Sequence, residues 1–559
     1  MTSSPLFLTS NPYSLLPPPP PHHHRRHSRF NPRCCTQNNT AKNARPNLAS
    51  SLCNAADDFI DKHLQKALKP SIDPRFVLAG NYAPVKETPP TECTKVEGTL
   101  PACINGVYLR NGPNPLFPPR PGQGHHLNDG DGMLHALSIR HGRPIFCSRF
   151  VHTDKLVQEL TAGRSLFPRV FAGFFGLAGM ARGALAAARA ALGVVDQSYA
   201  SGLANTSVLF FGKKFMALGE SGMPYAFVIT QNGDICNVGR HDFGGKLKLG
   251  MTAHPKIDPF TGELFASRYA FAPPFLNFFR VDTHGEKHPD VPIQSMKRPV
   301  FVHDFAITGN YAIIPDSQIV VDPMEMILRK GSLIVCDSAK VPRLGVLPRY
   351  AIDDSEMLWF DVPGLNIVHT LNAWEEGDEE LVLIAVNSEP VEYILEQNHL
   401  LKTCVEKIRL NLGSGSVSRK RLSSNLGLEF GVINPRYLTK KNRYAYMAIG
   451  APFPKARGFA KLDFEKEKDG GECIVGSRIF GENCFGGEGC FVARSDEKED
   501  DGYLVGFVHD ESAGTSKLLV MDALSPTLEI VASVQLPARV PYGFHGLFVS
   551  QDMAFDQSL

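Results

Sequence analysis

Short, apolar, β-favouring runs recur from Ser201 to the end of the chain, and this pattern constrains the fold more than any other feature. Turn-forming residues separate the runs, which include SVLFFGKKFMALGE, YAFVITQNGDICNVG, ELVLIAVNS, RYAYMAIG, YLVGFVHDES and LEIVASVQL. The Asn232-Gly233 pair between two of them predicts a hairpin turn. Many short antiparallel strands with few intervening helices favour a β-propeller or a large barrel over an α/β fold.

Composition narrows the class of protein. The 559 residues are 43% hydrophobic and 21% charged, which suffices for a large core. The formal net charge is only +1, so bulk electrostatics give no support for binding to nucleic acid. Abundant glycine and proline, 49 and 42 residues, agree with many turns between short strands.

The first 56 residues differ from the rest of the chain and predict a transit peptide. They contain no Asp or Glu, many Ser and Thr, a proline run at 17–21 and the basic cluster HHHRRHSR. An acid-free, hydroxylated, arginine-bearing N-terminus is typical of peptides that direct import into an organelle. The alternative is a basic disordered tail. We therefore divide the chain into a leader, residues 1–56, and a single domain, residues 57–559.

Two segments of the domain predict helices. DDFIDKHLQKALK, residues 57–69, is amphipathic and ends before Pro70. Residues 160–195 contain no acid, and arginines interrupt a run rich in Phe, Leu, Ala and Gly, of which 172–192 favours a helix. The segment is too polar to predict a transmembrane span. Two interpretations remain open, namely docking onto a lipid surface and a helix packed on the protein's own core.

Four histidines in strand-like settings are the candidate metal ligands. FVHDFAIT, residues 301–308, predicts one buried strand that places His303 in an apolar row and turns Asp304 to the other face. The other three histidines occupy similar settings in GMTAHPKIDP, NIVHTLNAW and PYGFHGLF: His254, His369 and His545. A buried imidazole needs a partner for each nitrogen, and a metal ion can supply one. For each histidine alone, hydrogen bonding to backbone groups is the alternative.

The wide spacing of these histidines excludes a zinc finger or an HExxH helix. It suits a ring of elements that each place one ligand on a common axis, as a propeller does. In RVPYGFHGLFV, residues 539–549, we expect the strand that closes such a ring. Zinc hydrolysis is a weaker alternative, because zinc enzymes normally use three protein ligands plus water.

Carboxylates should accompany the histidines. Four neutral imidazoles do not compensate the charge of a divalent metal, so carboxylates are expected to accept hydrogen bonds from the imidazole N–H groups. Glutamates in apolar strands fit this role, and the candidates are Glu220, Glu429 and Glu488. From the residues alone, an unrelated structural role fits each glutamate equally well.

The chain resembles the carotenoid cleavage oxygenase family, and most of all its type 4 plastid dioxygenases. The matching runs lie between Gly80 and Ser550 and are NYAPV, YLRNGPNP, DGDGMLHAL, MTAHPKIDP, FVHDFAIT, HTLNAWEE, LEFGVINPRY and RVPYGFHG. The resemblance implies an all-β fold, a seven-bladed β-propeller with a helical dome over the iron-bearing face, in which residues 160–195 form an insert. One position departs from the family motif, because Gly489 follows Glu488 where proline is expected.

The resemblance also implies the site and the cofactor. The cofactor is Fe(II), and the implied iron ligands are His254, His303, His369 and His545. The implied carboxylate partners of these ligands are Glu220, Glu429 and Glu488. Iron with four histidine ligands keeps positions available to O₂, and an electron-rich polyene removes the need for a reducing cosubstrate.

The implied activity is that of a non-haem iron(II) dioxygenase. It would cleave one carotenoid double bond with O₂, at 9,10 (9′,10′), and give apocarotenoid aldehydes or ketones such as ionones. The depth of an apolar tunnel would select the bond. Alternatives are cleavage of 9-cis-epoxycarotenoids or of apocarotenoids and, in another class, a non-catalytic propeller that binds apolar ligands. We expect a plastid protein, in chloroplasts or chromoplasts, peripheral on thylakoid or plastoglobule lipid through residues 160–195.

Overall fold

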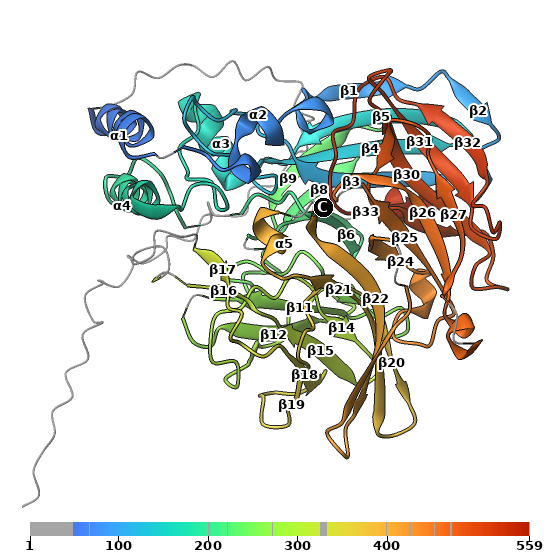
Figure 1. Cartoon of the computed structure of the whole chain (residues 1–559). Coiled ribbons are helices and arrows are strands. Elements are labelled where there is room, and N and C mark those ends of the chain that lie inside the picture. Colours follow the sequence, from blue (N-terminus) through green and yellow to red (C-terminus); the bar gives the residue numbers. More distant parts are fainter. Residues whose placement is uncertain are drawn as a thin grey trace, which may run out of the picture. The chain divides into compact units, whose positions relative to one another are not determined.

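Strands dominate the computed structural model, and helices are few (Figure 1). The structure describes residues 48–557, apart from 66, 199–201, 221, 271, 323, 325–332, 398–399, 424–425, 452 and 470–471. The expectations for residues 1–47 of the leader therefore lie outside the described residues. The all-β class predicted from the strand pattern is confirmed.

Antiparallel sheets follow one another along the chain. The first sheet has the spatial order β1 (Thr88–Glu92), β5 (Arg143–Phe150), β4 (Gly132–Arg140), β3 (Gly106–Pro113) and β33 (Gly546–Ser550). The second sheet comprises β6 (Ser207–Phe211), β7 (Lys214–Leu218), β8 (Tyr225–Ile229) and β9 (Ile235–Arg240). The third comprises β10 (Lys256–Ile257), β11 (Leu264–Tyr269), β12 (Leu276–Val281) and β13 (Val291–Pro292). As predicted, the pair Asn232-Gly233 turns the chain between β8 and β9, where Gly233 has a φ of 84°.

The remaining strands continue this arrangement. The fourth sheet comprises β14 (Ala306–Ile307), β15 (Tyr311–Asp316), β18 (Arg343–Pro348) and β19 (Leu358–Asp361), and the small pair β16 (Ile319–Val321) and β17 (Ile334–Cys336) lies within its sequence. The fifth comprises β20 (Ile367–Glu376), β21 (Glu380–Glu389), β22 (Lys402–Asn411) and β23 (Val417–Arg421). The largest sheet comprises β24 (Leu428–Val432), β25 (Tyr444–Gly450), β26 (Ala456–Asp463), β27 (Ile474–Ile479), β28 (Cys484–Gly486), β29 (Cys490–Ala493), β30 (Gly502–Asp510), β31 (Thr515–Asp522), β32 (Ile530–Gln535) and β2 (Val96–Gly98).

The last strand closes onto the first sheet. β33 pairs antiparallel with β3, from Gly106 opposite Ser550 to Arg110 opposite Gly546. In Figure 1 the colours pass from blue through green and yellow to red, and red β33 lies beside blue β3. The closing strand expected in residues 539–549 is therefore present, although it begins only at Gly546.

Each sheet is packed on both faces, and β21 shows how its sequence achieves this. Val382, Ile384 and Val386 face a core shared with β24–β26, whereas Leu381 and Leu383 alternate with them and face a core shared with β15 and β18. Successive side chains of a strand point to opposite faces, so a nearly continuous apolar run is required when both faces are covered. Such sheets stack face to face.

The prediction of a single strand at 301–308 is wrong. Only Ala306 and Ile307 pair in a sheet, as β14, whereas the backbone N–H of Phe301 donates to the carbonyl of Ile319 and that of Val302 to Val300. The apolar run therefore describes buried backbone that enters a sheet, and His303 lies in this entering segment rather than in a ladder.

The helices gather at the N-terminal part of the domain and differ in their bounds from those predicted. They are α1 (Leu48–Phe59), η1 (Ile60–Leu64), η2 (Pro70–Ile72), α2 (Pro74–Val77), η3 (Gly80–Tyr82), α3 (Asp154–Ala162) and α4 (Gly176–Ala191). Short helical segments elsewhere are α5 (Tyr393–Glu396), η6 (Pro435–Tyr437), η7 (Phe464–Asp469) and α6 (Gln551–Ala554). The helix predicted at 57–69 thus begins at Leu48 and ends at Leu64, while α4 lies inside the predicted range 172–192.

Helix α4 packs against α1 and η1, and the two helices lie side by side in Figure 1. No helix in the described part of the chain is both long and apolar enough to cross a bilayer.

Candidate metal centre

All four predicted histidines lie where the chain enters a sheet. His254 comes two residues before β10, His303 three residues before β14 and His545 immediately before β33, while His369 lies near the start of β20. β10, β14 and β20 are each the first strand of their sheet, and β33 joins the first sheet last. Equivalent entry points of different sheets thus converge on one place, although the histidines are far apart in sequence.

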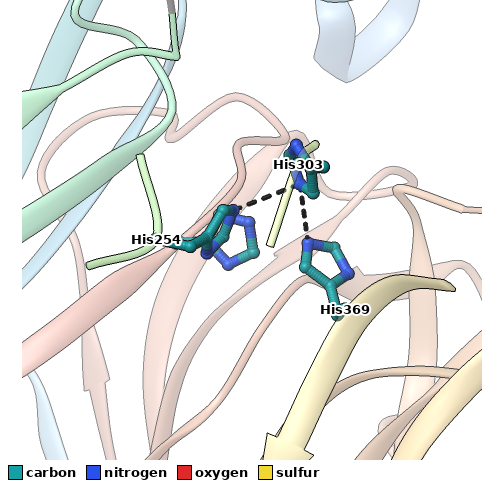
Figure 2. Close-up of side chains that lie close together, drawn as sticks. His254, His303 and His369 are labelled. Carbon is teal, nitrogen blue, oxygen red and sulfur yellow. Dashed lines mark hydrogen bonds between the residues drawn. The ribbon is translucent and has the colours of Figure 1, made fainter. Parts of the chain in front are cut away.

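The four imidazoles face one another. The Nε2 atoms of His254 and His303 are 3.1 Å apart, and those of His303 and His369 are 3.0 Å apart (Figure 2). His545 completes the group, with its ring centroid 4.4 Å from that of His254. One nitrogen from each of the four rings lies within 4.8 Å of all the others.

The spacing of these nitrogens fits a single metal ion. For a metal–nitrogen bond of about 2.1 Å, two ligands at 90° are about 3.0 Å apart, whereas tetrahedral ligands are about 3.4 Å apart. The measured 3.0 and 3.1 Å match the first value. Four imidazoles in such an arrangement leave two positions of an octahedral ion open.

Each predicted glutamate contacts one of the histidines through its Nδ1 atom. Glu220 pairs with His303, Oε2 of Glu429 lies 2.7 Å from His369, and Oε1 of Glu488 lies 2.8 Å from His545. A carboxylate at Nδ1 fixes the tautomer that leaves Nε2 free to bind a metal. Only Glu429 lies in a strand, since Glu220 follows β7 and Glu488 follows β28, so the expectation of strand positions is wrong for two of the three.

The remaining bonds of these carboxylates hold them in place. The hydroxyl of Tyr269 donates to Oε2 of Glu220 at 3.1 Å, and the backbone N–H of Gly546 donates to Oε2 of Glu488 at 3.0 Å. His254 has no carboxylate partner among the described residues; its backbone N–H donates to the hydroxyl of Thr252 at 3.0 Å. Three of the four rings are therefore oriented by carboxylates.

Burial keeps two of the rings neutral. Desolvation, together with the neighbouring imidazoles, lowers the pKa of His254 and of His303 well below its ordinary value. Burial also opposes protonation of His369, but the adjacent Glu429 outweighs it and raises the pKa of that ring. The side chains of His303, His369 and His545 are only 10–17% exposed. Neutral, largely desolvated imidazoles are the form that binds a metal.

A buried ion pair ties three of the ligand-bearing segments together, and the sequence did not reveal it. Asp304 follows His303 and pairs with Nζ of Lys256 at 2.7 Å, two residues after His254. The backbone N–H of Thr370, next to His369, donates to Oδ2 of the same aspartate at 2.8 Å. Although burial opposes ionisation, Lys256 lowers the pKa of Asp304. The sequence predicted that the side chain of Asp304 points away from that of His303. It did not predict that Lys256 and Thr370 are the partners of Asp304, because both are distant in sequence.

Phe430 is a second residue that the sequence did not single out. It follows Glu429 with a φ of 49°, and its ring centroid lies 5.6 Å from that of His369 and 5.5 Å from that of His545. A left-handed backbone at a bulky residue is costly and recurs at functional sites. A bulge in the β24–β25 pairing accompanies this conformation. The strained residue places an apolar wall beside two of the imidazoles.

Gly489 occupies a tight position. A Cβ atom there would lie 2.9 Å from Cζ of Phe459, a ring that is 2% exposed. The loop after Glu488 therefore packs directly against this aromatic side chain. Packing of Phe459 restrains the loop at the position where proline was expected.

Comparisons with known proteins agree with this arrangement. Residues 82–550 match the family described as "Retinal pigment epithelial membrane protein". The chain is 53% identical over 516 residues to 9-cis-epoxycarotenoid dioxygenase NCED1, chloroplastic, of Oryza sativa subsp. japonica, covering 90% of this chain and 80% of that relative. It is 51% identical over 513 residues to probable carotenoid cleavage dioxygenase 4, chloroplastic, of Arabidopsis thaliana, covering 90% and 86%.

Two further similarities extend the comparison. Carotenoid 9,10(9′,10′)-cleavage dioxygenase 1 of Phaseolus vulgaris is 39% identical over 516 residues, with coverage of 90% of this chain and 94% of that relative. Among solved structures, the lignostilbene dioxygenase of Pseudomonas brassicacearum superposes with a TM-score of 0.74 at 24% identity, covering 87% of this chain and all of that one. This last likeness supports a shared propeller-type fold.

Proposed function

The chain belongs to the retinal pigment epithelial membrane protein family, which includes the carotenoid cleavage oxygenases, and is a carotenoid cleavage dioxygenase; we propose that it works through one Fe(II) held by four histidines. The proposed ligands are His254, His303, His369 and His545. The observation that carries the proposal is the convergence of one nitrogen from each of these rings within 4.8 Å.

The finer architecture belongs to the same proposal. We assign seven blades, namely the five four- or five-stranded sheets and two halves of the largest sheet, which would divide between β26 and β28. Helices α1–α4 and their connections would form a dome over the face that carries the iron. A closed ring of blades explains why strands from both ends of the chain share the first sheet.

Iron in this position supplies activation of O₂. One O₂ and one carbon–carbon double bond contain all the atoms and electrons of two carbonyl groups, so no reducing cosubstrate is required. The surrounding side chains have separate tasks. Glu220, Glu429 and Glu488 hold the Nδ1 protons of three imidazoles, which aims the opposite nitrogen of each ring at the metal. The apolar ring of Phe430 limits the access of water and presents a surface suited to a polyene.

The proposed reaction is cleavage at the 9,10 (9′,10′) bond of a carotenoid, with apocarotenoid aldehydes or ketones such as ionones as products. A relative named for this bond is 39% identical, whereas a relative named a 9-cis-epoxycarotenoid dioxygenase is 53% identical. Cleavage of 9-cis-epoxycarotenoids is therefore the second candidate function.

A substrate panel separates the two candidates. The iron-loaded full chain is incubated with β-carotene, zeaxanthin and a 9-cis-epoxycarotenoid, and the products are identified by mass spectrometry. The proposal predicts ionone-type ketones and the matching apocarotenals. Products of 11,12 cleavage alone would assign the enzyme to epoxycarotenoids, and intact substrate despite bound iron would favour an apolar-ligand-binding protein.

We place the enzyme in plastids. The two relatives reported above at 53% and 51% identity are named chloroplastic, and the acid-free composition of the leader suits import. Because α1 begins at Leu48, the leader would end before that residue rather than at 56. A fusion of residues 1–56 to a fluorescent reporter should enter plastids, and retention of the reporter in the cytosol would refute this assignment.

We further propose that the helices α1 and α4 rest on a lipid surface. The exposed residues Leu48, Leu52 and Phe59 are spaced so that they form one stripe along α1, and Leu177 and Leu192 at the ends of α4 are 56% and 58% exposed. An uncovered apolar stripe of this kind marks a surface that docks onto membranes or partners. Phe174 and Phe175 of the 160–195 segment are only half-exposed, so α1 shares the docking role first expected of that segment.

A further inference from the structure

The helix pair α1 and α4 is built with its charges inside. Arg182 and Arg189, seven residues apart on α4, are 8% and 3% exposed. Arg182 donates to Asp61 at 2.9 Å, and Arg189 pairs with Asp57. Helix α4 therefore turns both of its charged side chains toward the protein and exposes Leu177, which reverses the usual arrangement of a surface helix. Helix α1 likewise exposes Leu48, Leu52 and Phe59 while Asp57 faces inward.

A pocket lies between this pair and the rest of the domain. It is enclosed by α1, α4 and the segments 120–124 and 165–173, and its charged and polar lining consists mainly of Asp57, Arg120, Gln123, Arg169, Arg182 and Arg189. Four arginines and one aspartate thus line it, while Asp61, outside the lining, pairs with Arg120 and Arg182, and Asp58 pairs with Arg120. The side chain of Arg120 is 33% exposed, so the pocket reaches the surface there.

The arginines are not fully balanced by acids. Arg169 donates to Gln123 at 3.1 Å and to the carbonyl of Phe117 at 3.4 Å, but no carboxylate of the described residues forms an ion pair with it. Nε of Arg189 and Nη2 of Arg164 are buried without a hydrogen-bond partner. Burial lowers the pKa of Arg169, although acids behind the pocket oppose this shift.

The acids behind the pocket are engaged elsewhere. Asp129 accepts the backbone N–H of Ala172 at 2.9 Å, and Lys155 pairs with Asp131 at 2.8 Å and with Glu159 at 2.7 Å. Burying a guanidinium without a carboxylate is costly, and an N–H donor left without an acceptor adds to that cost. The pocket therefore carries unused positive charge and unused donors.

We propose that this pocket binds a phosphate-type oxyanion. Guanidinium groups match the oxygen atoms of phosphate by paired, charge-assisted hydrogen bonds. A bound anion would satisfy the Nε donor of Arg189 and neutralise Arg169, both of which line the pocket. Free phosphate and the phosphate of a lipid headgroup share this chemistry, and the second experiment below distinguishes the two sources. The headgroup alternative rests on the proposed lipid contact.

The first experiment measures binding of inorganic phosphate to the iron-loaded full chain by calorimetry at low ionic strength. We expect saturable binding at one site per chain. Arg169→Gln removes a charge without leaving a carboxylate unpaired, and it should weaken binding about tenfold or more. Arg189→Lys keeps a charge beside Asp57 but removes the unpaired Nε donor, so it should act in the same direction and replaces Arg169→Gln if that variant loses iron. Arg143 lies in β5, away from the pocket lining, and its side chain is 75% exposed. The Arg143→Gln variant is the matched control, and it should bind phosphate as the wild type does.

The second experiment identifies the source of the anion. The wild type and the variants are sedimented with two kinds of vesicle, one of phosphatidylcholine alone and one with added phosphatidylglycerol. The bound fraction of each protein is compared between the two. A preference for phosphatidylglycerol that Arg169→Gln abolishes assigns the site to a headgroup. Phosphate binding without that preference assigns it to free phosphate. The absence of saturable phosphate binding in the wild type, with equal binding to both vesicles, overturns the proposal.

A double variant separates this site from the lipid contact itself. Leu52→Glu with Phe59→Glu changes only the outer stripe of α1, so it should reduce sedimentation with both vesicles about tenfold or more while phosphate binding persists. Unchanged sedimentation would refute the lipid contact and leave the anion site standing. Loss of phosphate binding in this variant, with iron content intact, would count against the assignment of the site to the inner face.

Discussion

The histidine centre and the helix pair α1–α4 both bury charged or polar groups, but the partners of these groups differ between the two regions. At the centre, each glutamate is matched to one imidazole, and the nitrogen atoms left over converge at 3.0–3.1 Å. In the helix pair, arginines and aspartates on two helices pair with one another, and apolar residues such as Leu52 are left facing outward. We propose that a metal ion completes the histidine centre and that a lipid surface covers the outer face of the helix pair.

This difference has a structural origin. The ligands of the centre come from four sheets, and each ligand is fixed by strand entry points that a closed ring holds in place. Helices α1 and α4 contact each other, and apolar side chains on the outer face of α1, such as Leu52 and Phe59, remain exposed. The centre should therefore be intolerant of single changes that the helix pair accepts.

The largest effect is expected at the centre. His303→Ala removes the imidazole that lies between His254 and His369, and we expect loss of iron and of carotenoid cleavage to background. Iron is measured by emission spectrometry and cleavage by loss of polyene absorbance. His284→Ala, in an exposed turn, is the control and should keep both. Full iron content in the His303 variant would show that this ring is not a ligand.

The next effect concerns the ion pair that joins the ligand segments. Asp304→Asn leaves Lys256 buried without a partner, which typically costs about 3–5 kcal/mol of unfolding free energy. We expect a lower unfolding temperature and faster loss of iron to a chelator. Adding Lys256→Met should restore most of the stability, because no uncompensated charge remains. Asp353→Asn, on an exposed loop, provides the matched control. Equal unfolding temperatures and equal rates of iron loss in the two aspartate variants would show that Asp304 does not hold the ligand segments together.

A smaller effect is expected from the carboxylates. Glu429→Gln keeps the ligand His369 but weakens the bond that orients it, and changes of this kind cost about 10- to 100-fold in activity or metal affinity. The turnover rate and the iron affinity are measured together. Glu472→Gln, at an exposed position, should match the wild type. A wild-type rate for Glu429→Gln would mean that activity does not depend on the carboxylate of Glu429 that orients His369.

The smallest effects come from one substitution made in both regions. Gly489→Ala would place a methyl group 2.9 Å from Cζ of Phe459, so we expect a loss of about 1–3 kcal/mol by overpacking. Gly183→Ala in α4 meets only Cε1 of Phe174 at 3.8 Å, and it should gain about 0.5–1 kcal/mol from helix propensity. Denaturant unfolding measures both. If the two variants shift stability in the same direction, the contrast between the regions is wrong.

Sequence patterns predicted the centre better than the elements that build it. Each histidine and glutamate lies in a short motif that resembles the family, so the resemblance singled it out without knowledge of the fold, whereas the residues alone left other roles open. The strand at 301–308 was predicted wrongly, because a buried segment that enters a sheet is as apolar as a strand within one. The contacts of Asp304 with Lys256 and Thr370 could not be predicted, since they join residues 48 and 66 positions apart in the sequence that meet only in the folded chain.

The helix pair shows the complementary limit. The sequence left open whether the arginine-bearing segment docks onto lipid or packs on the protein's own core. Arg182 and Arg189 lie inward because they pair with Asp61 of η1 and Asp57 of α1. The helix at 57–69 was placed nine residues too late, because residues 48–56 are small and polar enough to resemble a tail. Pairing between helices, rather than the periodicity of either, decides which face is buried.

The most direct test of the central claim is a titration of metal-free full-length protein with Fe(II), in which carotenoid cleavage is measured at each addition. The four-histidine centre predicts that the rate rises in proportion to iron and saturates at one ion per chain, and that Zn(II) added instead gives no cleavage. Cleavage without iron, equal cleavage with zinc, or saturation at a different stoichiometry would contradict it.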